Sequence, residues 1–145
     1  MESHDVVIAG AGPAGLTAAL YAGRARLSAV LYEAVTPGGW VIMTEAIENY
    51  PGAGKTSGAD LIGKMTEQAR SFGAEFRSGK VESLSPVDDE WEVAVGDDRL
   101  RARAVIVATG SGYRELGVPG ERRLTGRGVS YCATCDGPFY RDLEV

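Results

Sequence analysis

The strongest constraint on the fold is a glycine-rich turn that separates an apolar run from a helical pattern near the start of the chain. Residues 5–10, DVVIAG, form a β-branched run typical of a buried strand. Residues 13–27 place apolar side chains at helical spacing, with Pro13 suited to the first turn. A second strand is predicted at residues 28–33. Strand, helix and strand at this short spacing predict a βαβ unit with parallel strands.

The turn has the spacing GxGxxG, formed by Gly10, Gly12 and Gly15. The first glycine allows a tight turn, the second lets the backbone approach a pyrophosphate, and the third lets the helix pack closely on the strand. Glu33 ends the next strand, where a carboxylate binds ribose hydroxyls and repels a 2′-phosphate. The pattern therefore predicts FAD or NAD at this site, with an ordinary glycine-rich turn as the alternative.

Further along the chain the patterns indicate one more helix and several strands. Residues 60–72 have helical apolar spacing, and residues 79–86, 90–95 and 99–102 alternate as in an antiparallel meander. The run AVIVA at residues 104–108 predicts another buried strand. The expected class is α/β, a Rossmann-like parallel sheet with a β-meander. The Gly- and Pro-rich loop at residues 36–57 is long enough to be functional.

Composition excludes several classes of function. The 145 residues fit one domain, or one domain and part of another, and the net charge is −5. An acidic chain without a long basic run argues against nucleic-acid binding. The apolar runs are too short to span a bilayer, and the start MESHD is acidic, unlike a secretory signal. We therefore expect a cytoplasmic protein with neither a nucleic-acid nor a membrane partner.

The chain has two cysteines, Cys132 and Cys135, at CxxC spacing. In a reducing compartment such a pair is more often catalytic or metal-bound than a structural crosslink. At a helix N-terminus, CxxC spacing lets the helix dipole and the partner S–H lower the pKa of one thiol, and the adjacent Asp136 can transfer the proton that thiol exchange requires. Zinc needs four ligands, and the chain adds only His4, expected to be a polar residue on a loose terminus. We therefore predict a redox pair and no metal, with zinc and simple packing as the weaker alternatives.

The motifs in order are GAGPAGLTAALYAGRA, TEAIENYPG, VIVATGS, LGVPGE and GRGVSYCATCDGPFYR. Through them the chain resembles the N-terminal portion of bacterial-type, low-molecular-weight thioredoxin reductase over about residues 6–141. That family has an FAD-binding domain and an inserted NADPH-binding domain that carries the cysteine pair near its start. The resemblance implies an FAD-binding domain at residues 1–112, a linker at 113–119 and the start of a pyridine-nucleotide domain at 120–145.

The resemblance also implies roles for individual residues. The FAD pyrophosphate would be held by Gly10, Gly12, Pro13, Ala14 and Gly15, and the adenosine ribose by Glu33. Gly39 and Asn49 would line the flavin, and Ala108, Thr109 and Gly110 would close over the cofactor. Cys135 would face the flavin, Cys132 would attack the thioredoxin disulfide, Asp136 would be the acid–base group, and Arg127 and Phe139 would help to dock thioredoxin. For Arg127 and Phe139, a solvated charge and a core aromatic are equally good interpretations.

Two departures from the family pattern matter. The family usually has glutamine after the double glycine, where this chain has Trp40, whose indole has one donor and no acceptor. The family also runs much further, so this chain lacks the NADPH glycine motif and the returning segment of the FAD domain. We expect the intact protein to be a homodimer that passes electrons from NADPH through FAD to thioredoxin, and the 145 residues alone to be unable to complete that cycle.

The sequence is also compatible with several other functions. One is a related flavoprotein that reduces peroxiredoxins, and another is a thioredoxin reductase that takes electrons from ferredoxin instead of NADPH. A non-catalytic FAD- or nucleotide-binding fragment and a thiol-based adaptor without flavin are the alternatives from other classes.

Overall fold

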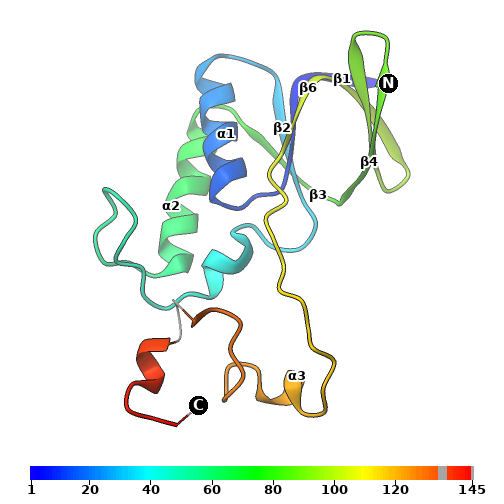
Figure 1. Ribbon diagram of the computed structural model, residues 1–145. Helices are drawn as coiled ribbons and strands as arrows, with labels where there is room; N and C mark the ends of the chain where they lie inside the picture. Colours follow the sequence, from blue (N-terminus) through cyan, green and yellow to red (C-terminus); the bar gives the residue numbers. More distant parts are fainter. Residues whose placement is uncertain (134–136, 145) are drawn as a thin grey trace. The chain divides into compact units, whose positions relative to one another are not determined.

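The structure of the chain is a computed structural model that describes residues 1–133 and 137–144, with only the backbone at positions 138 and 139. The chain divides into two compact units, Met1–Gly110 and Ser111–Val145. The first unit contains the sheet and the two longer helices (Figure 1).

A six-stranded mixed sheet forms the frame of the first unit. Its order is β3-β2-β1-β6-β5-β4, parallel from β3 to β6 and antiparallel from β6 to β4. This arrangement confirms the predicted α/β class, a parallel sheet extended by a β-meander. The strands are β1 (Glu2–Ala9), β2 (Ala29–Glu33), β3 (Glu75–Ser78), β4 (Val81–Val87), β5 (Glu90–Val95) and β6 (Asp98–Val107).

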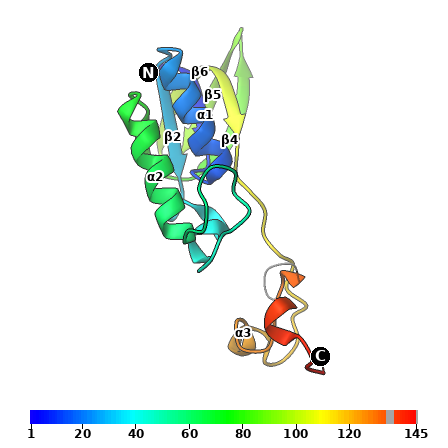
Figure 2. The same ribbon diagram turned by 90° about the vertical axis from the view of Figure 1, so that its left-hand side faces the viewer.

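Two helices, α1 (Pro13–Arg24) and α2 (Gly58–Ser71), lie side by side against the parallel strands (Figures 1 and 2). Pro13 opens α1, where its missing N–H costs nothing. The Ser57 hydroxyl accepts a hydrogen bond from the N–H of Asp60 at 3.0 Å and so caps α2. Both helices were predicted, although α1 ends three residues earlier than expected.

The side chains of β1 alternate between two apolar cores, as the period of a strand requires. Val6 and Ile8 pack with residues of α1 and α2 in the first core. Val7 packs in the second core with Val93 of β5 and Leu100 of β6. The meander therefore covers the face of the parallel strands opposite the helices, which buries β1 on both sides.

The sequence prediction was wrong about the first residues of the chain. Strand β1 begins at Glu2, not at residue 5, because β6 is long enough to pair with it from Leu100 onward. His4 is consequently buried within a strand, and its ring nitrogens bond to the Ser28 hydroxyl at 3.0 Å and the Glu2 carboxylate at 3.1 Å. His4 is not a polar residue on a loose terminus.

The expected strands at residues 99–102 and 104–108 are one continuous strand, β6. Its pairing with β5 ends at Ala102, so the remainder of β6 pairs with β1 alone. The expectation of a fully buried AVIVA strand is therefore wrong: Ile106 is 38% exposed and Val107 is 65% exposed. An isolated sheet edge of this kind leaves backbone groups available for pairing with further chain.

The remaining elements are short. Strand β3 was not predicted, because its four residues EFRS carry no clear alternation. The loop at residues 36–57 contains the 3₁₀ helix η1 (Gly39–Met43) and a bridge between Ile47 and Thr56. In the second unit, α3 (Glu121–Leu124) and the 3₁₀ helix η2 (Gly137–Tyr140) interrupt irregular chain. Among the described residues, no helix combines the length and apolar character needed to cross a bilayer.

Ile8 and Ile106 are paired neighbours on β1 and β6, yet only Ile8 is fully buried. We predict that Ile8→Ala lowers the free energy of unfolding by about 2–5 kcal/mol, because it leaves a cavity in the first core. Ile106→Ala, the matched control, should cost about 1 kcal/mol or less, since its side chain is already partly in water. Urea unfolding followed by circular dichroism measures both values. Equal costs would contradict the exposure of this part of β6.

Candidate functional site

The glycine turn lies at the carboxyl end of β1, where the neighbouring strands also end. Gly10 has φ +106°, and a Cβ at this position would lie 2.3 Å from the carbonyl oxygen of Ala108. Its N–H donates to the carbonyl of Tyr32, and the N–H of Ala108 donates to the carbonyl of Ala9, each at 2.8 Å. Glycine is thus required at Gly10 both by backbone conformation and by the approach of the chain after β6.

Gly15 allows α1 to pack directly on this turn. A Cβ at Gly15 would lie 1.8 Å from the carbonyl oxygen of Gly10, a separation that no side chain tolerates. The helix axis therefore begins immediately beside the end of β1. This is the packing that the third glycine of the motif was predicted to permit.

Gly12, in contrast, faces open space. No atom lies within 4 Å of the position that its Cβ would occupy, and its φ of −74° is open to any residue. Gly12 is the N-cap of α1, no side chain caps this end, and the first turn carries no acidic residue. The positive end of the helix dipole is therefore accessible at Gly12, as anion binding requires.

The Glu33 carboxylate reaches back from the end of β2 to the same turn. One of its oxygens accepts the N–H of Ala11 at 2.8 Å, and the other accepts the N–H of Val35 at 3.1 Å. The structure therefore brings the predicted ribose-binding carboxylate next to the predicted phosphate-binding turn.

The double glycine at positions 38 and 39 joins this group. The N–H of Gly38 donates to the carbonyl of Ala11 at 2.8 Å. Gly38 and Gly39 have φ values of +116° and +55°, which turn the chain into η1 beside the glycine turn. Gly38 and Ala11 were not predicted as site residues, although the sequence PGG was a signal for such a turn. Trp40 follows and is exposed for more than half of its surface.

The remaining predicted cofactor residues do not all lie at the glycine turn. Thr109 and Gly110 directly follow Ala108, and Gly110 has φ +70°. Asn49 is exposed in the loop between η1 and α2. Among the described residues, no hydrogen bond joins Asn49 to the glycine turn.

The cysteine segment belongs to the second unit. Cys132 is half-buried and disulfide-bonded, and its N–H donates to the Ser130 hydroxyl at 3.1 Å. Arg127 is exposed, with its N–H bonded to the carbonyl of Leu124 at 2.7 Å. Cys135, Asp136 and the side chain of Phe139 lie outside the described residues, so their predicted roles stay predictions.

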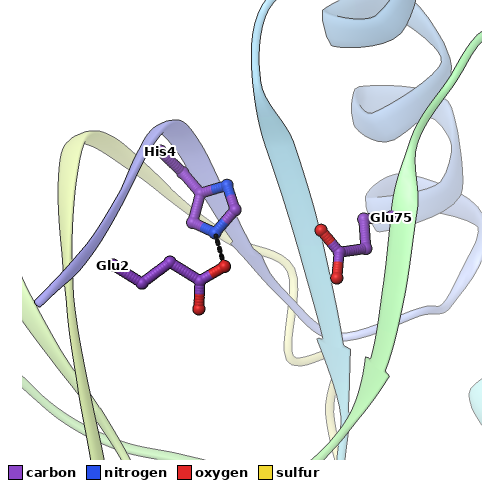
Figure 3. A group of neighbouring side chains, drawn as sticks. All are labelled: Glu2, His4 and Glu75. Atoms are coloured by element: carbon purple, nitrogen blue, oxygen red, sulfur yellow. Dashed lines mark hydrogen bonds and ion pairs between the residues drawn. The ribbon is translucent and has the colours of Figure 1, made fainter.

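Among the described residues, Glu2, His4 and Glu75 form a group whose carboxylate and imidazole atoms lie within 4.8 Å of one another (Figure 3). The Arg77 guanidinium is already bonded to two members of this group. It donates to the carboxylates of Glu2 and Glu75, each at 2.6 Å. A resident cation bonded to both carboxylates disfavours metal binding, so we interpret this group as an ion-pair network between β1 and β3.

The sequence of this chain is similar to known proteins over nearly its whole length. The model of a family described as pyridine nucleotide-disulphide oxidoreductase matches residues 4–144. The thioredoxin reductase of Bacillus subtilis is 48% identical over 142 residues, which cover 98% of this chain and 45% of the relative. The chain therefore spans a little less than half of the length of this relative.

Solved structures show the same relationship. The crystal structure of thioredoxin reductase from Streptococcus pyogenes matches with a TM-score of 0.85 and 48% identity, covering 97% of this chain and 46% of that one. A ferredoxin-flavin thioredoxin reductase from Clostridium acetobutylicum matches with a TM-score of 0.74 and 32% identity, covering 97% of this chain and 48% of that one.

The Arg77 network should make stability depend on pH. The hydrogen bond from Arg77 lowers the pKa of Glu2 from 4.5 to about 2. A carboxylate with a lowered pKa stabilises the fold above its unfolded pKa, and this contribution is lost as pH falls from 4.5 towards 2. We predict that Arg77→Gln lowers the melting temperature at neutral pH and reduces the further loss below pH 4.5.

Thermal melts across that pH range measure the effect. Arg101→Gln is the matched control, because Arg101 donates to the carbonyl of Val87 and not to a carboxylate. This control should keep the acid dependence of the unaltered chain. If Arg77→Gln has the same acid dependence too, the proposed coupling to Glu2 is wrong.

Substitution by alanine should change the stability of the fold much more at Gly15 than at Gly12. We predict that Gly15→Ala costs at least about 2 kcal/mol of unfolding free energy, because its Cβ would overlap the carbonyl of Gly10. Gly12→Ala should change stability by less than about 1 kcal/mol, since its Cβ meets no atom. Urea unfolding of both variants tests the packing. A comparable loss for both would contradict the open position of Gly12.

Proposed function

The chain belongs to the pyridine nucleotide-disulphide oxidoreductase family, and we propose that it is the N-terminal portion of a thioredoxin reductase-like flavoprotein disulfide reductase. The observation that carries the proposal is the uncapped N-terminus of α1 at Gly12, with the Glu33 carboxylate beside it. A glycine turn of this form suits the pyrophosphate and ribose of a dinucleotide. The disulfide-bonded Cys132 in the same chain supports a disulfide as the electron acceptor.

Enzymes of this family bind FAD, and intact thioredoxin reductases use NADPH as the second cofactor. The described residues fit the FAD pyrophosphate, because Gly12 leaves open space at the N-terminus of α1, whose first turn carries no acidic residue. Glu33 would exchange its bond to the N–H of Ala11 for bonds to ribose hydroxyls, or keep both. In this proposal the pyrophosphate is held by Gly10, Gly12, Pro13, Ala14 and Gly15.

The flavin end of FAD is assigned to the segments that converge on the turn. Gly39 follows Gly38, which is bonded to Ala11, and Ala108 follows the end of β6. We assign Gly39 and Asn49 to the flavin, and Ala108, Thr109 and Gly110 to the closure of the chain over the cofactor. Asn49 is exposed in the loop between η1 and α2, so in this proposal the loop brings its side chain to the flavin.

The redox step is assigned to the two cysteines. Bound FAD, once reduced by two electrons from NADPH, would supply the electron pair that reduces a disulfide between Cys132 and Cys135, and would return to its oxidised form. Breaking that S–S bond takes two electrons and two protons and leaves two thiols, and Asp136 would supply or accept a proton at the pair. The Cys132 thiolate would then attack the thioredoxin disulfide, forming a mixed disulfide that Cys135 resolves.

We propose that the 145 residues form one domain, a linker and the start of a second domain of a longer enzyme. We assign residues 1–112 to the FAD-binding domain, 113–119 to a linker and 120–145 to the start of the NADPH-binding domain. Both the half-length match to the relatives and the exposed edge of β6 at Ile106 and Val107 support the assignment to part of a longer enzyme. That enzyme would be a cytoplasmic homodimer that docks thioredoxin through Arg127 and Phe139.

A second candidate takes electrons from ferredoxin instead of NADPH. The match to the ferredoxin-flavin thioredoxin reductase from Clostridium acetobutylicum favours it, although its identity is lower than that of the Bacillus subtilis and Streptococcus pyogenes enzymes. Reduction of the flavin of the intact protein by NADPH, or by reduced ferredoxin, separates the two candidates.

We predict that the chain binds FAD weakly and that Gly12→Ala weakens this binding at least about tenfold, or ~1.4 kcal/mol. The added Cβ would take the space that the pyrophosphate needs, without disturbing the fold. Equilibrium dialysis against FAD, with flavin absorbance as the signal, measures both affinities.

Gly63→Ala is the matched control, because Gly63 lies in α2 and its Cβ would also meet no atom. This variant should keep the FAD affinity of the unaltered chain. Equal FAD binding by the Gly12→Ala and Gly63→Ala chains would contradict the assignment of Gly12, and no saturable binding by the unaltered chain would contradict the cofactor site itself.

A further inference from the structure

A buried carboxylate organises the second unit. Glu121 is only 5% exposed, although glutamate is rarely buried without partners. Its oxygens accept the N–H groups of Leu116 at 2.8 Å, Gly117 at 2.7 Å and Val118 at 3.3 Å. The Glu121 carboxylate also accepts the hydroxyl of Tyr131. One side chain thus joins the segment at residues 116–118 to the residue that precedes Cys132.

The side chain of Tyr131 is held by a hydrogen bond and by a ring contact. Its hydroxyl donates to Glu121, and its ring stacks on that of Tyr113, with centroids 3.7 Å apart and planes inclined by 12°. Tyr131 is followed directly by Cys132, whose N–H donates to the Ser130 hydroxyl at 3.1 Å. The backbone entering Cys132 is therefore restrained by an anchored side chain and by a local hydrogen bond.

The anchor is a charge-assisted hydrogen bond at neutral pH. The bond to Glu121 raises the pKa of Tyr131 to about 12, and the same bond is the largest cause of the lowered pKa of Glu121. The phenol therefore keeps its proton and the carboxylate stays ionised near pH 7. Hydrogen bonds of this type are stronger than those between neutral groups.

We propose that Glu121 and Tyr131 are positioning residues for the cysteine pair, because together they hold the backbone at Cys132 in the conformation of the disulfide and so favour the disulfide over the dithiol. This inference rests on the proposed function, since it takes Cys132 and Cys135 as a pair that cycles. Neither Glu121 nor Tyr131 was singled out in the sequence, although they lie in the motifs LGVPGE and GRGVSYCATCDGPFYR.

The anchor should favour the disulfide because it reduces the conformational entropy that the backbone loses when the disulfide forms. A dithiol tolerates many backbone conformations at Cys132, whereas a disulfide requires a narrow set. An anchor that already restricts the backbone lowers the entropy lost when the S–S bond closes, which raises the effective concentration of one thiol at the other. Removing the anchor should therefore destabilise the disulfide relative to the dithiol.

The equilibrium can be measured on the 145-residue chain in glutathione buffers. Two glutathione thiols give two electrons and two protons to the protein disulfide, which yields oxidised glutathione and two protein thiols. Samples are quenched with acid, alkylated with a mass-tagged maleimide and counted by mass spectrometry. The ratio of dithiol to disulfide at each buffer composition gives the equilibrium constant.

Tyr131→Phe is the decisive variant, because it removes the hydroxyl but keeps the ring that stacks on Tyr113. We expect it to shift the equilibrium constant towards the dithiol by about three- to tenfold, which corresponds to about 14–30 mV. Glu121→Gln should shift it in the same direction. The double variant should shift the equilibrium constant little beyond the value for Glu121→Gln alone, because Glu121→Gln already weakens the hydrogen bond that Tyr131→Phe removes.

Two matched controls accompany these variants. Tyr21→Phe makes the same chemical change at an exposed tyrosine of α1. Glu115→Gln removes a carboxylate that bonds to Arg122 and acts on Tyr131 only through its charge. Both controls should keep the equilibrium constant of the unaltered chain within about twofold, which separates the hydrogen bond from the charge.

Two different results would contradict the inference alone or the proposed function as well. If Tyr131→Phe lowers the melting temperature but has the equilibrium constant of the Tyr21→Phe control, the hydrogen bond serves folding alone and the inference is wrong. If alkylation of the unaltered chain is the same with and without reductant, the cysteines do not cycle, and the proposed function fails with it. Because Tyr131→Phe loses only one hydroxyl, the test does not depend on whether Glu121→Gln folds.

Discussion

The candidate site depends on one close contact, the packing of α1 against the end of β1. A side chain at Gly15 would overlap the carbonyl of Gly10, so the helix can begin at this place only with glycine there. The contact directs the N-terminus of α1 to the edge where β1, β2 and β6 all end. Glu33 and Gly38 are then positioned by hydrogen bonds to Ala11, within the turn between Gly10 and Gly15.

Electrostatics then determines what this edge can bind. The N-terminus of α1 carries a partial positive charge that no side chain of the helix neutralises. The neighbouring carboxylate of Glu33 is held on the N–H of Ala11, one residue before Gly12. A positive helix end beside a hydrogen-bond acceptor suits a ligand with both phosphate and hydroxyl groups, such as FAD. In the second unit, three backbone N–H groups donate to a carboxylate of the protein itself, that of Glu121.

Local pattern was sufficient for much of the fold and the site. The spacing of Gly10, Gly12 and Gly15 between a strand and a helix predicted the βαβ unit, and Glu33 was placed correctly at the end of the next strand. The alternation in the chain after α2 predicted the meander. These features depend on residues close together in sequence, where period and turn chemistry act directly.

What the sequence determined by itself was therefore the type of most elements, the glycine turn and the cysteine motif. Only the tertiary structure decided which residues are buried and which meet. His4 is buried because β6 pairs with β1 back to Glu2, and Ile106 is exposed because the pairing of β6 with β5 stops at Ala102. The bonds from Glu121 to residues 116–118 and to the residue before Cys132 likewise depend on chain folding in space. Such pairings depend on the lengths and positions of segments that are distant in the sequence, and a local sequence pattern contains no information about them.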